Sequence, residues 1–215
     1  MGLGEQLKKA LGKKVSEQLD KQEFVPAPPP KKNVLVATEL PVDSDKWIKM
    51  FRTIYKHVYG LDFIDDPNLL EVVQKFNTEA MTKGVALIGP PGNGKTSTLV
   101  ALSYLMNYTT GQRFDKHDTR KVATDFQEHG MIALNQCTRY PALIDDLGAE
   151  IVSNHYGNKV NVSKAIIESR YNAGEITHIT TNLTTEELEV YIGDRAYDRL
   201  RQMCDLHIIT AKSKR

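Results

Sequence analysis

Residues 89–96 read Gly89-Pro90-Pro91-Gly92-Asn93-Gly94-Lys95-Thr96 and match the phosphate-binding pattern G-x-x-x-x-G-K-[ST] in full. The apolar run Val85-Ala86-Leu87-Ile88 precedes them, and a helical stretch over 95–108 follows. Glycines let backbone N–H groups turn inward around phosphates, and the following helix directs its positive dipole end at the same charge. Because strand, loop and helix come in this order, a chance turn rich in glycine and proline is a poor alternative, and a nucleotide site is predicted.

Two side chains of this loop have the chemistry that a phosphate site needs. The Lys95 ammonium is expected to neutralise the β- and γ-phosphates of ATP, and the Thr96 hydroxyl is expected to ligate Mg²⁺. The residues expected to contact the nucleotide are Gly89, Pro90, Pro91, Gly92, Asn93, Gly94, Lys95, Thr96 and Ser97.

A pair of carboxylates ends a second apolar run, Ala142-Leu143-Ile144-Asp145-Asp146. Carboxylates at the C-terminal tip of a parallel strand project into the crevice where ligands bind. Asp145 is therefore the expected Mg²⁺ partner, through water, because Mg²⁺ keeps several of its waters. Asp146 could orient or deprotonate the attacking water. The alternative for Asp146 is a solvated turn residue beside Gly148.

The rest of the chain alternates between short apolar runs and helical stretches. This pattern is typical of an α/β fold in which helices cover both faces of a parallel sheet. Further strands are expected at 176–181 and 206–210, and helices at 44–59, 67–81, 162–172 and 185–192. The segment 111–140 is harder to interpret, and a helix at 119–128 and a weak strand near Phe114 are expected there.

The N-terminal region differs from the rest in composition. Apolar residues recur every four positions between Leu3 and Leu19, with lysines between them. This pattern predicts a basic amphipathic helix over residues 1–23 that must dock on this protein or on another. The prolines of 26–30 favour an extended chain, so residues 24–43 are expected to form a linker and residues 44–215 an ATPase domain.

Composition excludes several classes of protein. The formal net charge of +1 argues against a surface covered with basic residues for nucleic acid, although both ends of the chain are basic. No run approaches the roughly 18 apolar residues of a membrane span, so no membrane partner is expected. Cys137 and Cys204 give no disulfide framework, which favours a reducing cytoplasm, and the six histidines have no metal-ligand spacing.

Four motifs together resemble the DnaC/DnaI type of AAA+ ATPase and the related IstB-type ATPases. Two of them, the phosphate loop and the strand that ends in Asp145-Asp146, are generic to P-loop ATPases. The more specific two are Thr180-Thr181-Asn182-Leu183 and Gly193-Asp194-Arg195-Ala196-Tyr197-Asp198-Arg199-Leu200. The resemblance covers roughly residues 60–215.

The resemblance implies an AAA+ core with ATP and Mg²⁺ as cofactors, and a function in loading the replicative helicase during DNA replication. It implies that Asn182 is the polar sensor of the γ-phosphate or of the water. It also implies that Arg199 is an arginine finger, which completes the site of the next subunit in a homo-oligomer. The N-terminal region would bind the helicase, and single-stranded DNA is a further implied partner. Arg170 is expected to form a structural ion pair.

Three departures from the family bear on function. Asp146 stands where many active ATPases have Glu, and its shorter side chain predicts slow hydrolysis. The chain ends soon after its last expected strand, which implies a reduced or absent C-terminal lid. Segment 111–140 is short for the DNA-contacting helices of initiators. The alternatives that stay open are a transposition helper ATPase of the IstB type, an adaptor in which ATP acts only as a switch, and a small-molecule kinase, for which no acceptor site is marked.

Overall fold

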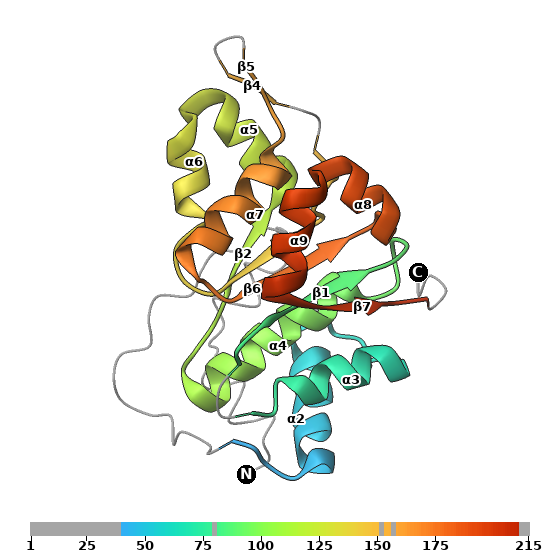
Figure 1. The fold of residues 1–215 in the computed structure, drawn as a ribbon. Helices are drawn as coiled ribbons and strands as arrows, with labels where there is room; N and C mark the ends of the chain where they lie inside the picture. The colour runs from blue at the N-terminus through green and yellow to red at the C-terminus, as the bar shows by residue number, and fades with distance from the viewer. Residues whose placement is uncertain (1–39, 79–80, 151–152, 156–157, 211–215) are drawn as a thin grey trace.

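Five parallel strands form the central sheet of the structure, a computed structural model that describes residues 40–78, 81–150, 153–155 and 158–210. The strands lie in the order β2-β3-β6-β1-β7 (Figure 1). The predicted parallel sheet is therefore confirmed, and the weak strand expected near Phe114 is β2, at one edge. The bounds are Gly84–Ile88 for β1, Asp115–Asp118 for β2, Ala142–Asp145 for β3, Thr177–Thr181 for β6 and Cys204–Ile208 for β7.

Helices cover both faces of the sheet, as predicted (Figure 1). One apolar core lies among α2, α3, α4 and the sheet, and a second lies among α5 to α9 and the opposite face. Strand β1 contributes side chains to both cores, because Val85 and Leu87 belong to the first core and Ala86 belongs to the second. The helices are Ser44–Tyr59 (α2), Pro67–Lys75 (α3), Lys95–Thr110 (α4), Thr119–His129 (α5), Met131–Gln136 (α6), Val162–Ala173 (α7), Thr185–Ile192 (α8) and Asp194–Met203 (α9).

Helix α2 has clear start and stop signals. The Asp43 side chain accepts hydrogen bonds from the backbone N–H groups of Asp45 and Lys46, and Gly60 ends the helix in the left-handed conformation. The helix buries Trp47 completely, and the indole Nε1 donates to the Val73 carbonyl of α3 at 2.7 Å. This bond and the surrounding core fix α2 against α3.

Helix α3 ends earlier than its apolar pattern predicts, at Lys75 instead of near residue 81. Phe76 then turns into the core, and the Asn77 side chain bonds both the backbone N–H of Val42 (2.8 Å) and its carbonyl (2.7 Å). These tertiary contacts favour a chain that leaves the helix over continuation of its periodicity. They also attach the described end of the expected linker, residues 40–43, to the domain.

Two features of the structure were not predicted. Helix α6 has six residues and begins directly after Gly130, so it is too short to show a period. Strands β4 (Ser153–His155) and β5 (Asn158–Val160) form a small antiparallel pair with three residues each. The expected helix over 1–23 and most of the linker lie outside the described residues. Over the described ranges, no helix has the length and apolar character needed to cross a membrane.

Candidate active site

The phosphate loop lies between β1 and α4, as its sequence predicts. Gly89, Gly92 and Gly94 all have positive φ, at 153°, 83° and 93°, which side chains rarely tolerate. A Cβ at Gly89 would lie 2.2 Å from the Ile209 carbonyl oxygen, so only glycine fits there. Helix α4 begins at Lys95 with no side chain capping its N-terminus. Its first N–H groups are therefore available to an anion.

Asn93 fastens the loop to the end of β7. Its side chain is fully buried, and Nδ2 donates to the Ile209 carbonyl at 3.0 Å. Its Oδ1 accepts from the Lys95 ammonium at 3.1 Å. The sequence placed Asn93 in the loop only by pattern, whereas the structure shows that it supports both the loop backbone and the lysine.

The Lys95 ammonium lies at the centre of the loop. It donates to the carbonyls of Gly89 (2.6 Å) and Pro90 (2.8 Å), and to Oδ1 of Asn182 at 3.0 Å. Burial lowers the pKa of Lys95 to about 8, and the nearby carboxylates of Asp146 and Asp145 act in the opposite direction. A partly dehydrated cation surrounded by loop carbonyls is suited to bind phosphate oxygens.

Asp145 occupies the tip of β3 beside the loop, and its side chain is only 6% exposed. Its Oδ1 accepts hydrogen bonds from the hydroxyls of Thr96 and Thr180, both at 2.6 Å. Its Oδ2 lies 2.9 Å from the Lys116 ammonium of β2. The structure thus places Asp145 next to Thr96 as expected, but it adds Thr180 and Lys116, which sequence reasoning did not identify.

The pairing of Thr96 with Asp145 fits a magnesium site. A hydroxyl and a carboxylate in contact are hard oxygen donors, the ligand type that Mg²⁺ prefers. Thr96 lies in the first turn of α4 and Asp145 at the C-terminal end of β3, both beside the phosphate loop, so these two residues would hold the ion beside the phosphates. The described residues include no cluster of three or more His, Cys, Asp or Glu side chains that could hold a metal ion.

Asp146 has a backbone conformation that residues other than glycine seldom adopt, with φ 55°. Its N–H donates to the Thr180 hydroxyl at 2.9 Å, which holds the turn in place. Its carboxylate contacts Arg120 (3.2 Å) and the Asn182 amide Nδ2 (3.2 Å). Burial, followed by the charge of Asp145, raises the pKa of Asp146. A carboxylate with a raised pKa at the mouth of a phosphate site is a reasonable proton acceptor.

Asn182 joins the two halves of the site. It follows β6, and its amide accepts from Lys95 through Oδ1 and donates to Asp146 through Nδ2. A single side chain therefore contacts both the lysine of the phosphate loop and the second carboxylate. Its expected role as the sensor of the γ-phosphate stays a prediction.

Ser97 lies in the first turn of α4 and faces α2. Its hydroxyl donates to the Gly94 carbonyl at 3.0 Å and accepts from the Tyr55 hydroxyl at 3.1 Å. Ser97 thus links the start of α4 to α2, and its contacts within the chain are structural.

Arg199 lies on α9, and its contacts are with α7 rather than with the phosphate loop. Its Nη1 is 3.4 Å from Glu168 Oε1, and its guanidinium lies 5.1 Å from the centroid of the Tyr171 ring. The structure therefore does not bring Arg199 together with the residues around Lys95 of the same chain. Its expected role in the site of a neighbouring subunit stays a prediction.

Arg170 is structural, but the expected ion pair is not its means of stabilisation. The side chain is fully buried, and it donates to the backbone carbonyls of Cys137 (2.6 Å), Tyr140 (3.0 Å) and Ile176 (2.8 Å). It also donates to the Thr177 hydroxyl at 2.7 Å. Backbone acceptors satisfy the guanidinium here, and they hold the segment before β3 and the start of β6 together.

The residues that sequence reasoning missed come from two places. Thr180 belongs to the recognised Thr180-Thr181-Asn182 stretch, so its position two residues before the expected sensor Asn182 could have marked it. Lys116 and Arg120 belong to the segment 111–140, whose sequence alone gave no register. Their role becomes visible once β2 pairs with β3, because the pair Asp118↔Asp145 brings this segment beside both carboxylates.

Comparison with known proteins shows a likeness in fold. No family model and no curated protein sequence matches the chain. Among solved structures, the crystal structure of the DnaC helicase loader is similar with a TM-score of 0.56 and 22% identity, over 69% of this chain and 93% of that one. The DnaI crystal structure gives a TM-score of 0.55 and 22% identity, over 70% and 89%. AMPPCP-bound DnaA from Aquifex aeolicus gives 0.52 and 17%, over 68% and 48%.

These likenesses concern the fold, because the identities are 22% or less. In this chain, the five-stranded parallel sheet carries the phosphate loop after β1 and the pair Asp145-Asp146 at the end of β3. The chain therefore has the P-loop AAA+ fold, of the form found in the DnaC and DnaI helicase loaders.

Proposed function

We propose that this chain is an ATPase that loads the replicative helicase during DNA replication. The observation that supports it most is the Asn182 side chain, which contacts both Lys95 and Asp146. A bridge between a phosphate-binding lysine and a second carboxylate can respond to the γ-phosphate. The likeness in fold to the DnaC and DnaI loaders supports the choice of helicase loading among the functions of such ATPases.

Each residue of the candidate site would have a separate role at the phosphates of ATP. Lys95 and the N–H groups of the loop would hold the β- and γ-phosphates, and Thr96 and Asp145 would hold Mg²⁺. When bound, this ion neutralises charge that develops on the transferred phosphoryl group. Asp146 would orient and deprotonate the attacking water, and Asn182 would fix the distance between that water and the γ-phosphate.

Arg199 would act on the site of the neighbouring subunit. An arginine inserted from a neighbour stabilises charge on the γ-phosphoryl group and can raise turnover by roughly 10³- to 10⁵-fold. Within this chain, Glu168 and Tyr171 hold the Arg199 guanidinium, and its side chain is 15% exposed, so Arg199 would have to leave these contacts to enter the neighbouring site.

Mixing two inactive variants tests the proposed ATPase and its shared site together. Lys95→Ala should lack nucleotide binding, and Arg199→Ala should bind nucleotide but turn it over slowly. A mixture should recover turnover, because intact sites can form from the loop of one subunit and the arginine of another. Arg201→Ala, on the same helix, is the matched control and should keep wild-type turnover. A turnover of the mixture that does not exceed the summed turnover of the two variants measured separately would refute the shared site.

The partner is tested through the N-terminal region. Deletion of residues 1–30 should abolish binding to the replicative helicase while ATP binding to the core is kept. Helicase binding by this truncated chain with unchanged affinity would remove the role assigned to the predicted basic helix. Capture of transposase instead of helicase by the full chain would favour the transposition alternative.

One observation favours a second candidate, an adaptor in which ATP is bound but not hydrolysed. Arg120 lies 3.2 Å from the Asp146 carboxylate and so competes with any water for it. Turnover by purified protein with DNA and helicase, measured against Lys95→Ala, separates the two candidates. Equal turnover by the two proteins, with nucleotide binding lost only in the variant, would select the adaptor.

A further inference from the structure

A lysine outside the phosphate loop reaches the carboxylate that would hold the metal. The Lys116 ammonium lies 2.9 Å from Asp145 Oδ2, while Thr96 and Thr180 occupy Oδ1. The carboxylate is therefore fully engaged within the chain, with one cation and two hydroxyls. Because a buried carboxylate is costly unless it is paired, this cation contributes to the stability of the tip of β3.

The sheet register explains how Lys116 arrives there. Lys116 pairs with Leu143, and Asp118 pairs with Asp145, in the parallel ladder between β2 and β3. Alternate residues of a strand share a face, so Lys116 and Asp145 are diagonal neighbours on one side of the sheet. A lysine side chain spans that diagonal. Its side chain is 26% exposed, so the ammonium is held against the carboxylate with little freedom to move into water.

The other cations near the two carboxylates have other partners. Lys95 is surrounded by the carbonyls of the loop and by Asn182, and Arg120 pairs with Asp118 and Asp146. Within the described residues, Lys116 is thus the cation that forms an ion pair with Asp145. The Lys116 ammonium contacts Asp145 Oδ2, whereas the two threonine hydroxyls donate to Oδ1.

We propose that Lys116 is a tethered counter-cation of the metal-binding carboxylate, which reduces the dependence of nucleotide binding on Mg²⁺. Without a divalent ion, Lys116 offsets the charge of Asp145 and so limits its repulsion of phosphate. With a divalent ion at Asp145, the lysine repels that ion and weakens its binding. The inference rests on the proposed ATP site and goes beyond it by assigning a position that the loop motifs do not contain.

The test compares the dissociation constant of a fluorescent ATP analogue in EDTA with that in excess Mg²⁺. For the wild type, the two constants should lie within about tenfold of each other, since one partly exposed charge offsets part of the metal's effect. Lys116→Met should raise this ratio at least about tenfold, by weakening binding in EDTA and lowering the Mg²⁺ concentration needed for half-saturation. Lys116→Arg keeps the charge and should keep the wild-type ratio.

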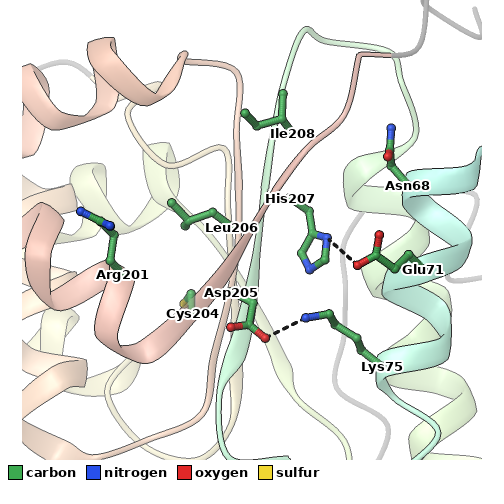
Figure 2. Close-up of a pocket in the computed structure, with 9 residues that line it drawn as sticks. All are labelled: Asn68, Glu71, Lys75, Arg201, Cys204, Asp205, Leu206, His207 and Ile208. Atoms are coloured by element: carbon green, nitrogen blue, oxygen red, sulfur yellow. Dashed lines mark hydrogen bonds and ion pairs between the residues drawn. The ribbon is translucent and has the colours of Figure 1, made fainter.

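Lys75→Met is the matched control. Lys75 forms an ion pair of similar length, 2.8 Å, with Asp205 of β7, the opposite edge strand of the sheet (Figure 2). Its substitution removes one lysine and one ion pair, and the metal dependence should stay unchanged. A second measurement needs no nucleotide: Mg²⁺ alone should raise the melting temperature of Lys116→Met more than that of the wild type or of Lys75→Met.

The outcomes separate this inference from the function on which it rests. Suppose that the wild type, Lys116→Met and Lys75→Met all bind nucleotide with the same ratio of the dissociation constants in EDTA and in Mg²⁺. This result would overturn the role of Lys116 and would not affect the proposal of the ATP site. A wild-type ratio far above tenfold would do the same, even if Lys116→Met failed to fold. Wild-type protein that bound no nucleotide in either buffer would overturn the ATP site and the counter-cation together.

Discussion

Replacement of Thr180 by valine removes one hydroxyl and keeps the shape of a β-branched side chain in β6. That hydroxyl is buried, donates to Asp145 Oδ1 at 2.6 Å and accepts from the Asp146 N–H at 2.9 Å. A hydrogen bond to a charged group contributes about 1.5–3 kcal/mol, and a buried N–H left without an acceptor costs about 1–3 kcal/mol. The gain from valine in a strand is below about 1 kcal/mol. We therefore expect Thr180→Val to lower the free energy of unfolding by about 2–5 kcal/mol.

Thr181→Val is the matched control for this prediction. The Thr181 hydroxyl is also buried, but it donates to a neutral acceptor, the Leu147 carbonyl, at 2.7 Å and accepts from the Leu183 N–H at 3.1 Å. Its loss also leaves an N–H without its acceptor, but the bond that it donates is neutral and contributes about 0.5–1.5 kcal/mol, so Thr181→Val should cost about 1 kcal/mol less than Thr180→Val. The excess for Thr180 measures its contact with the Asp145 carboxylate.

Urea denaturation followed by circular dichroism measures both variants, with the slope checked for two-state behaviour. Repetition in an Asp145→Asn background should shrink the effect of Thr180→Val toward that of Thr181→Val, because the acceptor is then neutral. Equal losses for the two variants in the native background would refute the charge-assisted bond. A loss that Asp145→Asn leaves unchanged would refute it equally.

Three further changes test other parts of the structure. Arg170→Met should lower the free energy of unfolding by about 3 kcal/mol or more in urea denaturation, because three backbone carbonyls lose their donor in the interior; a loss below about 1 kcal/mol would contradict this. Burial lowers the pKa of His178 to about 3 from 6.5. Between pH 6.5 and pH 3, the imidazole therefore binds a proton in the unfolded state but not in the folded state. Stability should therefore fall as pH drops from 6.5 toward 3, by up to about 1.4 kcal/mol per unit, and His178→Phe should flatten that fall in unfolding measured across pH. Tyr55→Phe removes the bond to Ser97 and should cost about 0.5–1.5 kcal/mol by urea denaturation without changing nucleotide affinity.

The order of elements and the phosphate site could be predicted because they depend on local signals. Strands β1 and β3 are short apolar runs, and the loop pattern fixes where β1 ends and α4 begins. Asp43 and Gly60 bound α2 through capping chemistry that acts within a few residues. Asp145 was singled out by its position at a strand tip, and the structure places it in contact with Thr96.

The rest depends on contacts between distant segments. The end of α3 is decided by Asn77 and its bonds to Val42, thirty-five residues away in the chain. The role of Lys116 is decided by the register of β2 on β3, since a shift by one residue would turn it to the other face. The wrong expectation for Arg170 has the same origin. The sequence shows which carboxylates could pair with an arginine, but it does not show which backbone carbonyls the fold leaves without another donor.

The bond from Asn93 to the carbonyl of Ile209 sets a boundary for any shorter version of this protein. A fragment that keeps every recognised motif but stops before residue 209 would keep the sequence of the phosphate loop and lose the carbonyl that anchors the buried Asn93 side chain. Such a fragment would have a complete loop motif but a misplaced Lys95. Engineering of a minimal nucleotide-binding unit from this chain should therefore treat the last strand as part of the loop, although more than a hundred residues separate them in sequence.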